Sequence, residues 1–240
     1  MREILKKIIG ERMLGVVDYI RKPELKKSWG GPFNNQQYRQ QIYLELIKKI
    51  HFDAIVETGT FRGTTTHFLF EKSNLPVYTT ELHPRFYTYS KLRFISVSGI
   101  HIYNLDSRDF LRQLSSDAAL IGKQLFFYLD AHWNDDLPLL EEIKIIFNNW
   151  PSSVIMIDDF KVPDDPDYTY DNYGAGKELS LEYLKPLSYL KFFAFFPSKK
   201  GNDETGFKRG CVILVRDEEL IEKIKTFSKI NLLYSNYAAS

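Results

Sequence analysis

Cysteine is almost absent from this sequence of 240 residues, which contains only Cys211. One cysteine cannot form an intramolecular disulfide, so a reducing compartment, the cytoplasm, is the simplest expectation. No apolar run of about 18 residues or more occurs, which argues against a membrane-spanning helix. Charge of one sign is not in excess either, because 32 basic and 31 acidic residues leave a formal net charge of +1. We therefore do not expect nucleic acid as the main partner.

The composition and the order of apolar segments predict one α/β domain. Hydrophobic residues make up 44% of the sequence and charged residues 26%, and no internal repeat or low-complexity linker divides the chain. Short apolar runs alternate with segments of helical periodicity, as a parallel sheet requires. The expected strands are 53–57, 76–80, 100–104, 124–130 and 153–158, and the expected helices are 36–50, 64–72, 84–97, 107–115, 136–148 and 177–187. Two further apolar runs, 191–196 and 210–215, predict an antiparallel pair near the end.

The most informative segment is 54–63, Ala-Ile-Val-Glu-Thr-Gly-Thr-Phe-Arg-Gly, in which an apolar strand leads directly into a glycine-bearing turn. Gly59 and Gly63 would let a ligand approach the backbone, and the threonines at 64–66 can begin a helix whose free N–H groups face that ligand. Neither a G-x-G-x-x-G pattern nor a Walker loop is present. The alternative is a strand-to-helix turn without a ligand.

Acidic residues follow two of the next strands. Glu81 ends the strand expected at 76–80, a position from which a doubly wound sheet reaches a ribose diol, and one carboxylate can accept from both hydroxyls. The alternative for Glu81 is a solvated strand end. Asp106 follows the strand expected at 100–104 and could meet an adenine amino group, or it could cap the helix that begins nearby.

The strongest concentration of acids follows the strands expected at 124–130 and 153–158. Asp130 begins the sequence Asp-Ala-His-Trp, and Asp158 and Asp159 follow the other strand. Ligands bind at the carboxyl ends of parallel strands, so both acidic clusters should open into one crevice. Three converging carboxylates repel one another unless they are protonated or neutralised, and Mg²⁺ is the most suitable cation. The alternative is a turn and a helix cap with no metal.

Together these residues resemble the class I S-adenosylmethionine-dependent methyltransferases over approximately residues 30–216. The resemblance implies a Rossmann-like, doubly wound α/β fold with a mostly parallel seven-stranded sheet, an antiparallel last strand and helices on both faces. It also implies the following cofactor contacts: Glu57, Gly59, Thr60, Phe61, Gly63, Thr64 and Thr65 at the methionine end, Glu81 and Leu82 at the ribose, Asp106 and Ser107 at the adenine, and Asp130 beside them.

A narrower resemblance is to the metal-dependent O-methyltransferases, both those similar to catechol O-methyltransferase and those similar to macrocin O-methyltransferase and cephalosporin hydroxylase. Carried over by position, Asp130, Asp158 and Asp159 are expected to bind Mg²⁺. The inserted Ala131 departs from the catechol pattern, and the base lysine of that family has no match. His132, which titrates near neutral pH beside Asp130, is the first candidate for the catalytic base, and an inert core histidine is the alternative.

The resemblance implies methylation of a hydroxylated small molecule, such as a sugar or a natural-product scaffold. The alternatives are a cofactor-binding protein without methyl transfer and a hydroxylase-like relative of the same fold. The irregular segment 160–176 is too long for an ordinary connection. We expect its tyrosines, Tyr168, Tyr170 and Tyr173, to form a wall that faces the acceptor.

Residues 1–35 are expected to form an accessory helix and a lid, and residues 36–240 the cofactor-binding domain. Apolar residues at helical spacing within 1–22 predict a helix that packs on the domain or forms a homo-oligomer contact, and a membrane-surface helix is the alternative. The segment 29–37 is rich in glycine, aromatic and amide residues. It could close over the reacting sulfur and bind the methionine carboxylate, or it could be a turn followed by a helix cap.

Overall fold

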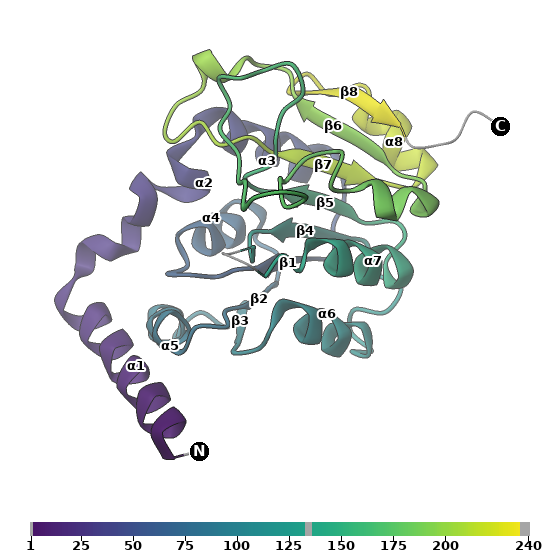
Figure 1. Ribbon diagram of the computed structural model, residues 1–240. Coiled ribbons are helices and arrows are strands. Elements are labelled where there is room, and N and C mark those ends of the chain that lie inside the picture. Colours follow the sequence, from purple (N-terminus) through teal and green to yellow (C-terminus); the bar gives the residue numbers. More distant parts are fainter. Residues whose placement is uncertain (1, 133–135, 236–240) are drawn as a thin grey trace.

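The computed structural model describes residues 2–132 and 136–235. Its central feature is a β-sheet with helices on both faces, and a long N-terminal helix leads away from this body (Figure 1). The elements are α1 (Arg2–Arg21), η1 (Pro23–Gly30), α2 (Pro32–Asn35), α3 (Gln37–Lys49), β1 (Ala54–Thr58), α4 (Thr64–Ser73), β2 (Val77–Thr80), α5 (Pro84–Arg93), β3 (Ile100–Tyr103), α6 (Ser107–Ser115), β4 (Leu125–Leu129), α7 (Leu139–Asn149), β5 (Val154–Ile157), η2 (Lys185–Leu190), β6 (Phe193–Pro197), η3 (Gly201–Asp203), β7 (Val212–Val215), α8 (Glu218–Ile224) and β8 (Ile230–Ser235).

The strands form one sheet in the order β3-β2-β1-β4-β5-β7-β6-β8. Neighbouring strands from β3 to β5 are parallel, whereas β7 is antiparallel to both β5 and β6. The Rossmann-like, doubly wound fold and its antiparallel end are thus confirmed. The sheet has eight strands where we expected seven, because β8 adds to the edge of β6. This edge strand, Ile-Asn-Leu-Leu-Tyr-Ser, includes polar residues and does not alternate regularly between apolar and polar, so its sequence gives only a weak strand pattern.

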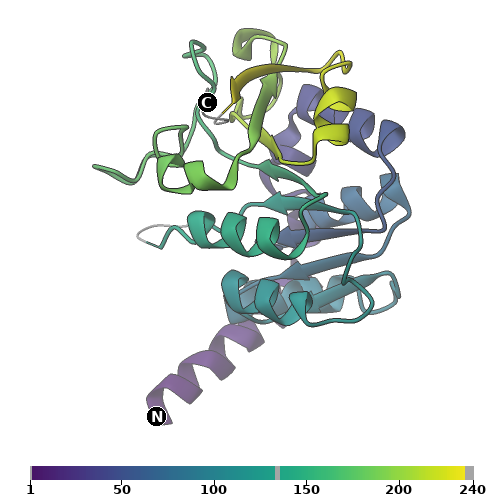
Figure 2. The ribbon, with the colours of Figure 1, turned by 90° about the vertical axis from the view of Figure 1, so that its right-hand side faces the viewer.

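Successive residues of each strand pack into different helical layers, as the pleat of a strand requires. Ile55 belongs to one apolar cluster and Val56 to the other. Helices α3, α4, α5 and α8 contribute to the cluster on one face of the sheet, and α6, α7 and η2 to the cluster on the other. The view in Figure 2 shows helices on either side of the sheet. Because a helix between successive parallel strands returns the chain to the opposite end of the sheet, the carboxyl ends of these strands all lie at one edge.

Loop contacts, a proline and packing account for the differences from the expected helices. The helix expected at 177–187 does not form, and its place is taken by turns and the 3₁₀ helix η2. Residues 177–179 are bonded to the loop before them instead, since the backbone N–H of Leu179 donates to the carbonyl of Asp171 at 3.0 Å and that of Tyr173 to the carbonyl of Lys177 at 3.1 Å. Pro138, at the N-cap position, delays the start of α7 from 136 to Leu139. The helix expected at 84–97 ends at Arg93, and the ring of Phe94 packs against Gly63.

Helix α1 is formed as predicted, and it lies against α5. Its residues Ile9, Met13, Val17 and Ile20 are exposed, so this apolar stripe does not face the body. Within the described part of the chain, no helix has both the length and the apolar character needed to cross a bilayer. The division into residues 1–35 and 36–240 stays a prediction.

Candidate functional site

The carboxyl ends of β1, β2, β4 and β5 open into one pocket of about 1020 Å³. Its wall includes Gly59 after β1, Glu81 after β2, Asp130 after β4 and Asp159 after β5. Residues predicted from separate strand ends therefore meet in a single cavity, as a parallel sheet requires. Ligand pockets usually measure about 300–1,000 Å³, so this pocket has room for a nucleoside and a second small molecule.

The glycines of the turn after β1 are required by packing within the protein. Gly59 has φ +93°, and a Cβ there would lie 2.3 Å from the carbonyl oxygen of Asp130. Gly63 has φ +72°, and a Cβ there would lie 2.3 Å from Cε2 of Phe94. Both φ angles lie in the left-handed region that favours glycine. Gly59 lines the pocket but Gly63 does not, which corrects the expectation that a ligand's approach explains both glycines.

Glu57 lies behind the pocket and is not part of its wall. Its Oε2 atom accepts hydrogen bonds from the hydroxyl of Thr66 at 2.5 Å and from that of Thr79 at 2.7 Å. Burial raises the pKa of Glu57 to about 7, although the two hydroxyl donors act in the opposite direction. Glu57 thus ties α4 to β2 beneath the turn. This corrects the direct cofactor contact that we expected of it.

The start of α4 forms one end of the pocket. Four of the predicted residues line it here: Thr60, Phe61, Thr64 and Thr65. Gly63 precedes the helix and provides no side-chain cap, so the first N–H groups of α4 are suited to an anionic group. The hydroxyl of Thr65 accepts a hydrogen bond from the backbone N–H of Phe33 at 3.2 Å, which places the segment 29–37 beside this end of the pocket.

Glu81 and Leu82 form the wall beyond β2. The carboxylate of Glu81 accepts hydrogen bonds from the backbone N–H groups of Phe61 and His83, each at 2.8 Å. Burial raises the pKa of Glu81. These backbone donors fix the carboxylate in the pocket wall. Leu82 is 62% exposed and presents an apolar surface next to it.

Asp106 and Ser107 line the pocket at the start of α6. Asp106 caps this helix by accepting a hydrogen bond from the backbone N–H of Arg108 at 2.9 Å, which confirms the capping alternative. The guanidinium of Arg108 also donates to Asp106 at 2.7 Å and thereby lowers the pKa of that carboxyl group. These hydrogen bonds hold the side chain of Asp106 in the pocket wall, where we expected it. Its contact with an adenine stays a prediction.

At the other end of the pocket, Asp130, His132 and Asp159 offer ligand atoms that all lie within 4.8 Å of one another. Burial and the nearby Asp159 raise the pKa of Asp130. Burial alone would also raise the pKa of Asp159, but His132 and Arg209 hold it well below its usual value. Nε2 of His132 is buried, has no hydrogen-bond partner among the described residues, and lies 3.9 Å from carboxylate oxygens of both Asp159 and Asp171.

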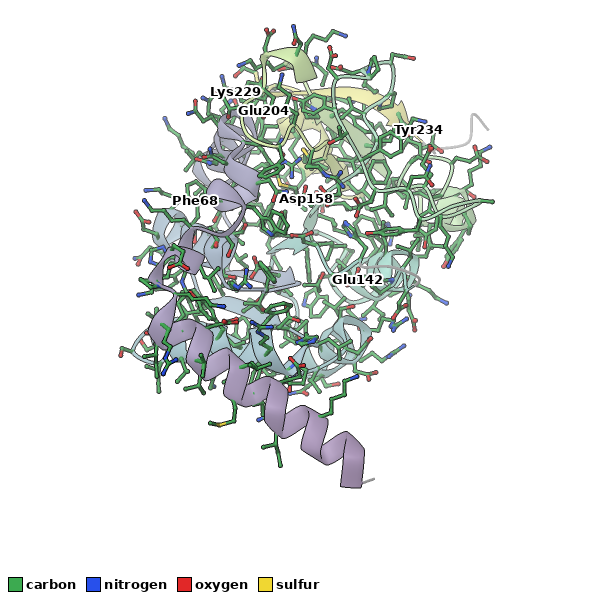
Figure 3. All side chains as sticks on the ribbon, turned by 60° about the vertical axis from the view of Figure 1, so that its left-hand side comes forward. Phe68, Glu142, Asp158, Glu204, Lys229 and Tyr234 are labelled. Carbon is green, nitrogen blue, oxygen red and sulfur yellow. The ribbon has the colours of Figure 1, made fainter. Side chains whose placement is uncertain are left out.

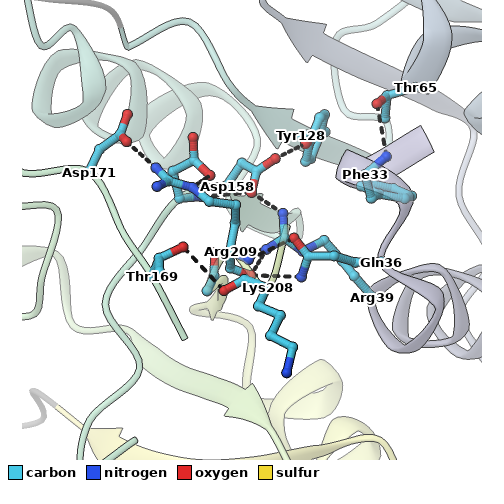
Figure 4. A network of polar contacts seen from close by, with 12 residues as sticks. Phe33, Gln36, Arg39, Thr65, Tyr128, Asp158, Thr169, Asp171, Lys208 and Arg209 are labelled. Carbon is cyan, nitrogen blue, oxygen red and sulfur yellow. Dashed lines mark hydrogen bonds and ion pairs between the residues drawn. The ribbon is translucent and has the colours of Figure 1, made fainter. Parts of the chain in front are cut away.

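Asp158 is engaged elsewhere, although it lines the pocket (Figure 4). Its Oδ1 atom pairs with the buried guanidinium of Arg39 and accepts from the backbone N–H of Asp159 at 2.7 Å. Its Oδ2 atom accepts from the hydroxyl of Tyr128. The group whose ligand atoms lie close together is Asp130, His132 and Asp159, so among the expected metal ligands Asp158 is the one that stands apart, and its role as a ligand stays a prediction. Figure 3 shows Asp158 near the centre of the molecule.

Three charged residues that pair with side chains of the site escaped the sequence analysis, namely Arg39, Asp171 and Arg209. Arg209 donates from Nε to Asp159 at 2.6 Å, and its guanidinium also pairs with Asp171 (Figure 4). Arg39 occupies a position on the buried face of α3, which is shared with Ile42 and Leu46. A charged residue at an apolar position of an amphipathic helix was a signal that could have identified it. No comparable signal marks Arg209 or Asp171.

The aromatic wall of the pocket differs from the predicted one. Five Trp, Phe and Tyr side chains line it, from the segments before α2, after β1, in α5, in β4 and before β7: Trp29, Phe61, Phe86, Tyr128 and Phe207. Trp29 stacks on Phe61 at 6.3 Å and meets Phe207 edge-on at 5.8 Å between ring centroids. Tyr168, Tyr170 and Tyr173 do not line the pocket, because Tyr168 is buried in the core and the other two bond to Glu178 and Asp171. The expected tyrosine wall is therefore wrong.

The segment 29–37 is attached to the loop before β7. The backbone N–H of Phe207 donates to the carbonyl of Asn34 at 3.2 Å. Gln36 donates to the carbonyl of Arg209 and accepts from its backbone N–H, each at 2.8 Å. Gly206 fits tightly beneath, since a Cβ there would lie 2.2 Å from the Asn34 carbonyl oxygen. The closing role of this segment stays a prediction. Trp133, the last residue of the sequence Asp-Ala-His-Trp, lies outside the described residues.

The sequence matches no protein-family model and no curated protein. Solved structures do share the fold. An O-methyltransferase from Bacillus cereus in complex with SAH is 15% identical, with a TM-score of 0.53 over 75% of this chain and 80% of that one. The SAH-bound Podospora anserina methyltransferase PaMTH1 is 12% identical, with a TM-score of 0.51 over 88% of each chain.

A third similar structure is the O-methyltransferase TomG from Streptomyces achromogenes, involved in tomaymycin synthesis, in complex with SAM. It is 14% identical, with a TM-score of 0.51 over 74% of this chain and 78% of that one. At these identities the likeness concerns the fold. The chain therefore has the Rossmann-like fold of the class I S-adenosylmethionine-dependent methyltransferases.

Proposed function

We propose that this protein transfers the methyl group of S-adenosylmethionine to a hydroxyl oxygen of a small molecule, assisted by Mg²⁺. The observation that carries this proposal is a single pocket with two chemically different ends. Glu81 and the start of α4 form one end, and Asp130, His132 and Asp159 form the other. The fold supports it as well, because similar solved structures are complexes of methyltransferases with SAH or SAM.

The end formed by β1, β2 and α6 suits the nucleoside and methionine parts of the cofactor. The carboxylate of Glu81 would accept hydrogen bonds from the ribose hydroxyls, and the first N–H groups of α4 would bind the methionine carboxylate. Leu82 would lie beside the ribose, and Asp106 and Ser107 would contact the adenine. When bound, S-adenosylmethionine supplies a methyl group that the sulfonium charge has already activated. The protein's own task is therefore to align the reactants and exclude water.

The acidic end fits a hard divalent cation. Asp130 and Asp159 are two carboxylates at one point, and their repulsion would be relieved by such an ion, for which carboxylate oxygens are preferred ligands. Mg²⁺ at this point would supply Lewis acidity that lowers the pKa of an acceptor hydroxyl. Asp158, with both oxygens occupied, takes no part in our proposal as a ligand.

His132 is placed to receive the proton that the acceptor must lose. In the transfer the sulfur–carbon bond breaks while the carbon–oxygen bond forms, and the hydroxyl proton passes to Nε2 of His132. This atom is buried beside the pocket and has no hydrogen-bond partner among the described residues. Asp159 and Asp171 face it, each at 3.9 Å, and would stabilise the resulting imidazolium.

The acceptor would bind against Trp29 and Phe207. Both side chains line the pocket, and they are 56% and 54% exposed, which is unusual for large aromatic residues with no partner to cover them. Trp29 also adopts a left-handed φ of 56°, a conformation that costs free energy in a residue other than glycine. A ring-bearing acceptor that stacks here would account for both features.

Isothermal titration calorimetry with S-adenosylhomocysteine tests the proposal. The wild type should bind it, and Glu81→Gln should raise the dissociation constant at least about tenfold, because a neutral amide forms weaker hydrogen bonds to a diol than a carboxylate does. Glu182→Gln, a substitution of a carboxylate that is exposed and distant from the pocket, is the matched control. Absence of binding by the wild type would end the proposal.

A second candidate is methyl transfer without a metal. It is favoured by Arg209, whose Nε atom already donates to Asp159 at 2.6 Å and partly neutralises the acidic end. His132 would then act as the base alone. Binding of S-adenosylhomocysteine without transfer to any hydroxylated compound would instead indicate a cofactor-binding protein that lacks turnover.

A further inference from the structure

Helix α1 is fastened to the segment that carries Glu81 and Leu82. Figure 3 shows α1 across the near side of the molecule, with its N-terminal end extending beyond the other elements. Three kinds of contact attach the helix, and all of them reach the β2–α5 connection or the first turns of α5. Since this connection carries Glu81 and Leu82, contacts that hold α1 there also affect the pocket wall.

The first contact is a close approach of two backbones. Gly15 lies in the middle of α1, and a Cβ there would lie only 2.4 Å from the carbonyl oxygen of Arg85. Any larger residue would therefore push α1 away from the first turn of α5. Near it, the rings of Tyr19 and Tyr89 meet edge-on at 5.6 Å between centroids.

The second contact is an ion pair at the same turn. Asp18 is 3% exposed and accepts a hydrogen bond from Nε of Arg85 at 2.7 Å. A second donor, Nζ of Lys22, reaches Asp18 at 2.8 Å. The negative charge of Asp18 also lies beside the N-terminal turn of α5, where it is favourable.

The third contact runs through the side chain of Asn104, which follows β3. Its Nδ2 group donates to the carbonyl of Glu81 at 2.8 Å and to that of Leu82 at 3.0 Å. Its Oδ1 atom accepts from Nη2 of Arg12 in α1 at 3.2 Å. One amide side chain therefore bridges the helix to two consecutive residues of the pocket wall, and it does so without lining the pocket itself.

We propose that Asn104 is a positioning residue for the cofactor, and that α1 is a working part of the cofactor site because Arg12, Gly15 and Asp18 hold the segment that Asn104 fixes. This inference rests on the proposed function. The carboxylate of Glu81 can meet a ribose only where its backbone places it, and Asn104 holds the carbonyl groups of the Glu81–Leu82 and Leu82–His83 peptides. Loosening this segment would misplace the carboxylate and the apolar surface of Leu82 together.

The test combines S-adenosylhomocysteine calorimetry with amide hydrogen exchange on the full chain. Asn104→Ala should raise the dissociation constant about tenfold, the size expected for the loss of one or two hydrogen bonds. Arg12→Ala and Gly15→Ala should raise it about threefold, since each weakens only the support from α1. Asn148→Ala, at an exposed amide in α7, is the matched control and should bind as the wild type does.

The amide of His83 provides a readout that a general loss of stability would not single out. It donates to Glu81 and should exchange faster in Asn104→Ala than in the wild type, while amides of β4 keep their protection. Binding within twofold of the wild type in Asn104→Ala, with unchanged His83 exchange, would overturn the inference. An effect of Asn104→Ala without any effect of Arg12→Ala and Gly15→Ala would overturn the part that concerns α1. A wild type that does not bind at all would contradict the proposed function, whereas the exchange measurement still tests the anchoring.

Discussion

Two buried carboxyl groups show how surroundings decide what an acidic residue does in this protein. Glu57 and Asp158 are both 1% exposed. Asp158 faces the guanidinium of Arg39, so its charge is compensated in place. Glu57 receives only the hydroxyls of Thr66 and Thr79, which cannot compensate a full charge. Asp158 therefore has a partner for its charge, whereas Glu57 is suited to hold a proton up to neutral pH.

Glu57→Gln should change how stability depends on pH. The folded protein raises the pKa of Glu57 from 4.5 to about 7, so this group's stabilising contribution is complete below pH 4.5 and is lost as the pH rises through about 7. A shift of this size corresponds to about 3 kcal/mol, and the variant lacks the ionisation. Urea unfolding at pH 4.5 and pH 8 should show the wild type losing about that much stability relative to Glu57→Gln.

The exposed residue Glu219 provides the control for this comparison, since Glu219→Gln should follow the pH profile of the wild type. Parallel profiles for the wild type and Glu57→Gln would mean that folding does not raise the pKa of Glu57.

Among the elements, α3 is held at its N-terminal end by a residue that is distant in the sequence. The carboxylate of Glu204 accepts hydrogen bonds from the backbone N–H groups of Tyr38 at 3.0 Å and Arg39 at 3.2 Å, and it is buried. Gln36, at the N-cap position, makes no capping bond of its own. Glu204 thus replaces the missing cap and attaches α3, and the segment before it, to the β6–β7 connection.

Glu204→Ala should lower the free energy of unfolding by about 1–2 kcal/mol, the usual cost of losing a helix cap. The variant leaves two buried N–H groups of α3 without an acceptor, whereas Glu204→Gln retains an acceptor oxygen and should fall between it and the wild type. Chemical denaturation measures the effect. The matched control is Glu182→Ala, in which the truncated residue is exposed. Equal stability of Glu204→Ala and the wild type would show that α3 needs no cap from this loop.

Trp29 belongs to the segment that Glu204 and the Asn34 contact hold in place. Trp29→Ala should raise KM for a ring-bearing acceptor about tenfold and change kcat little, because stacking contributes to binding before the reaction and in the transition state alike. Affinity for S-adenosylhomocysteine should change less than that. Steady-state methyl transfer gives both constants, and a Leu233→Ala variant, altered at an exposed apolar residue of β8, serves as the control.

At the scale of the whole molecule, different strands of the sheet support the cofactor end and the acidic end of the pocket. Strands β1 and β2 and helix α4 support the cofactor end of the pocket, and β4 and β5 support the acidic end. The two ends share one cavity but few side chains. They should therefore respond independently to changes at either end.

Removal of divalent metal should abolish methyl transfer and leave the affinity for S-adenosylhomocysteine within about twofold, since no predicted metal ligand contributes to ribose or adenine binding. Excess EDTA followed by re-addition of Mg²⁺ tests this in one titration. Asp159→Asn should show the same loss without rescue. Full activity in EDTA would favour the metal-free alternative, in which Arg209 neutralises Asp159 and His132 acts alone.

The sequence alone determined the fold class and the sites at the strand ends. Strand and helix patterns are local, because periods of about 2 and 3.6 residues are visible in any short window, and an acid after a strand must come to the carboxyl edge of a parallel sheet. Glu81 and Asp130 were identified on this basis and lie in the pocket as expected. The expected helix at 177–187 failed because residues 177–179 hydrogen-bond to the preceding loop, a contact that apolar spacing does not reveal.

Only the tertiary structure decided which charges meet. Asp158 pairs with Arg39 across 119 residues, and Arg209 reaches Asp159 across 50. Contacts between such distant residues leave no local trace in the sequence, because they depend on how the layers pack and not on the periodicity of one segment. The proposed roles of Asn104 and α1 could not be read from the sequence either, because they depend on hydrogen bonds that link Arg12, through Asn104, to the β2–α5 connection. The local sequence thus determined most of the helices and strands, whereas the packing of distant segments determined which partners each charged side chain has.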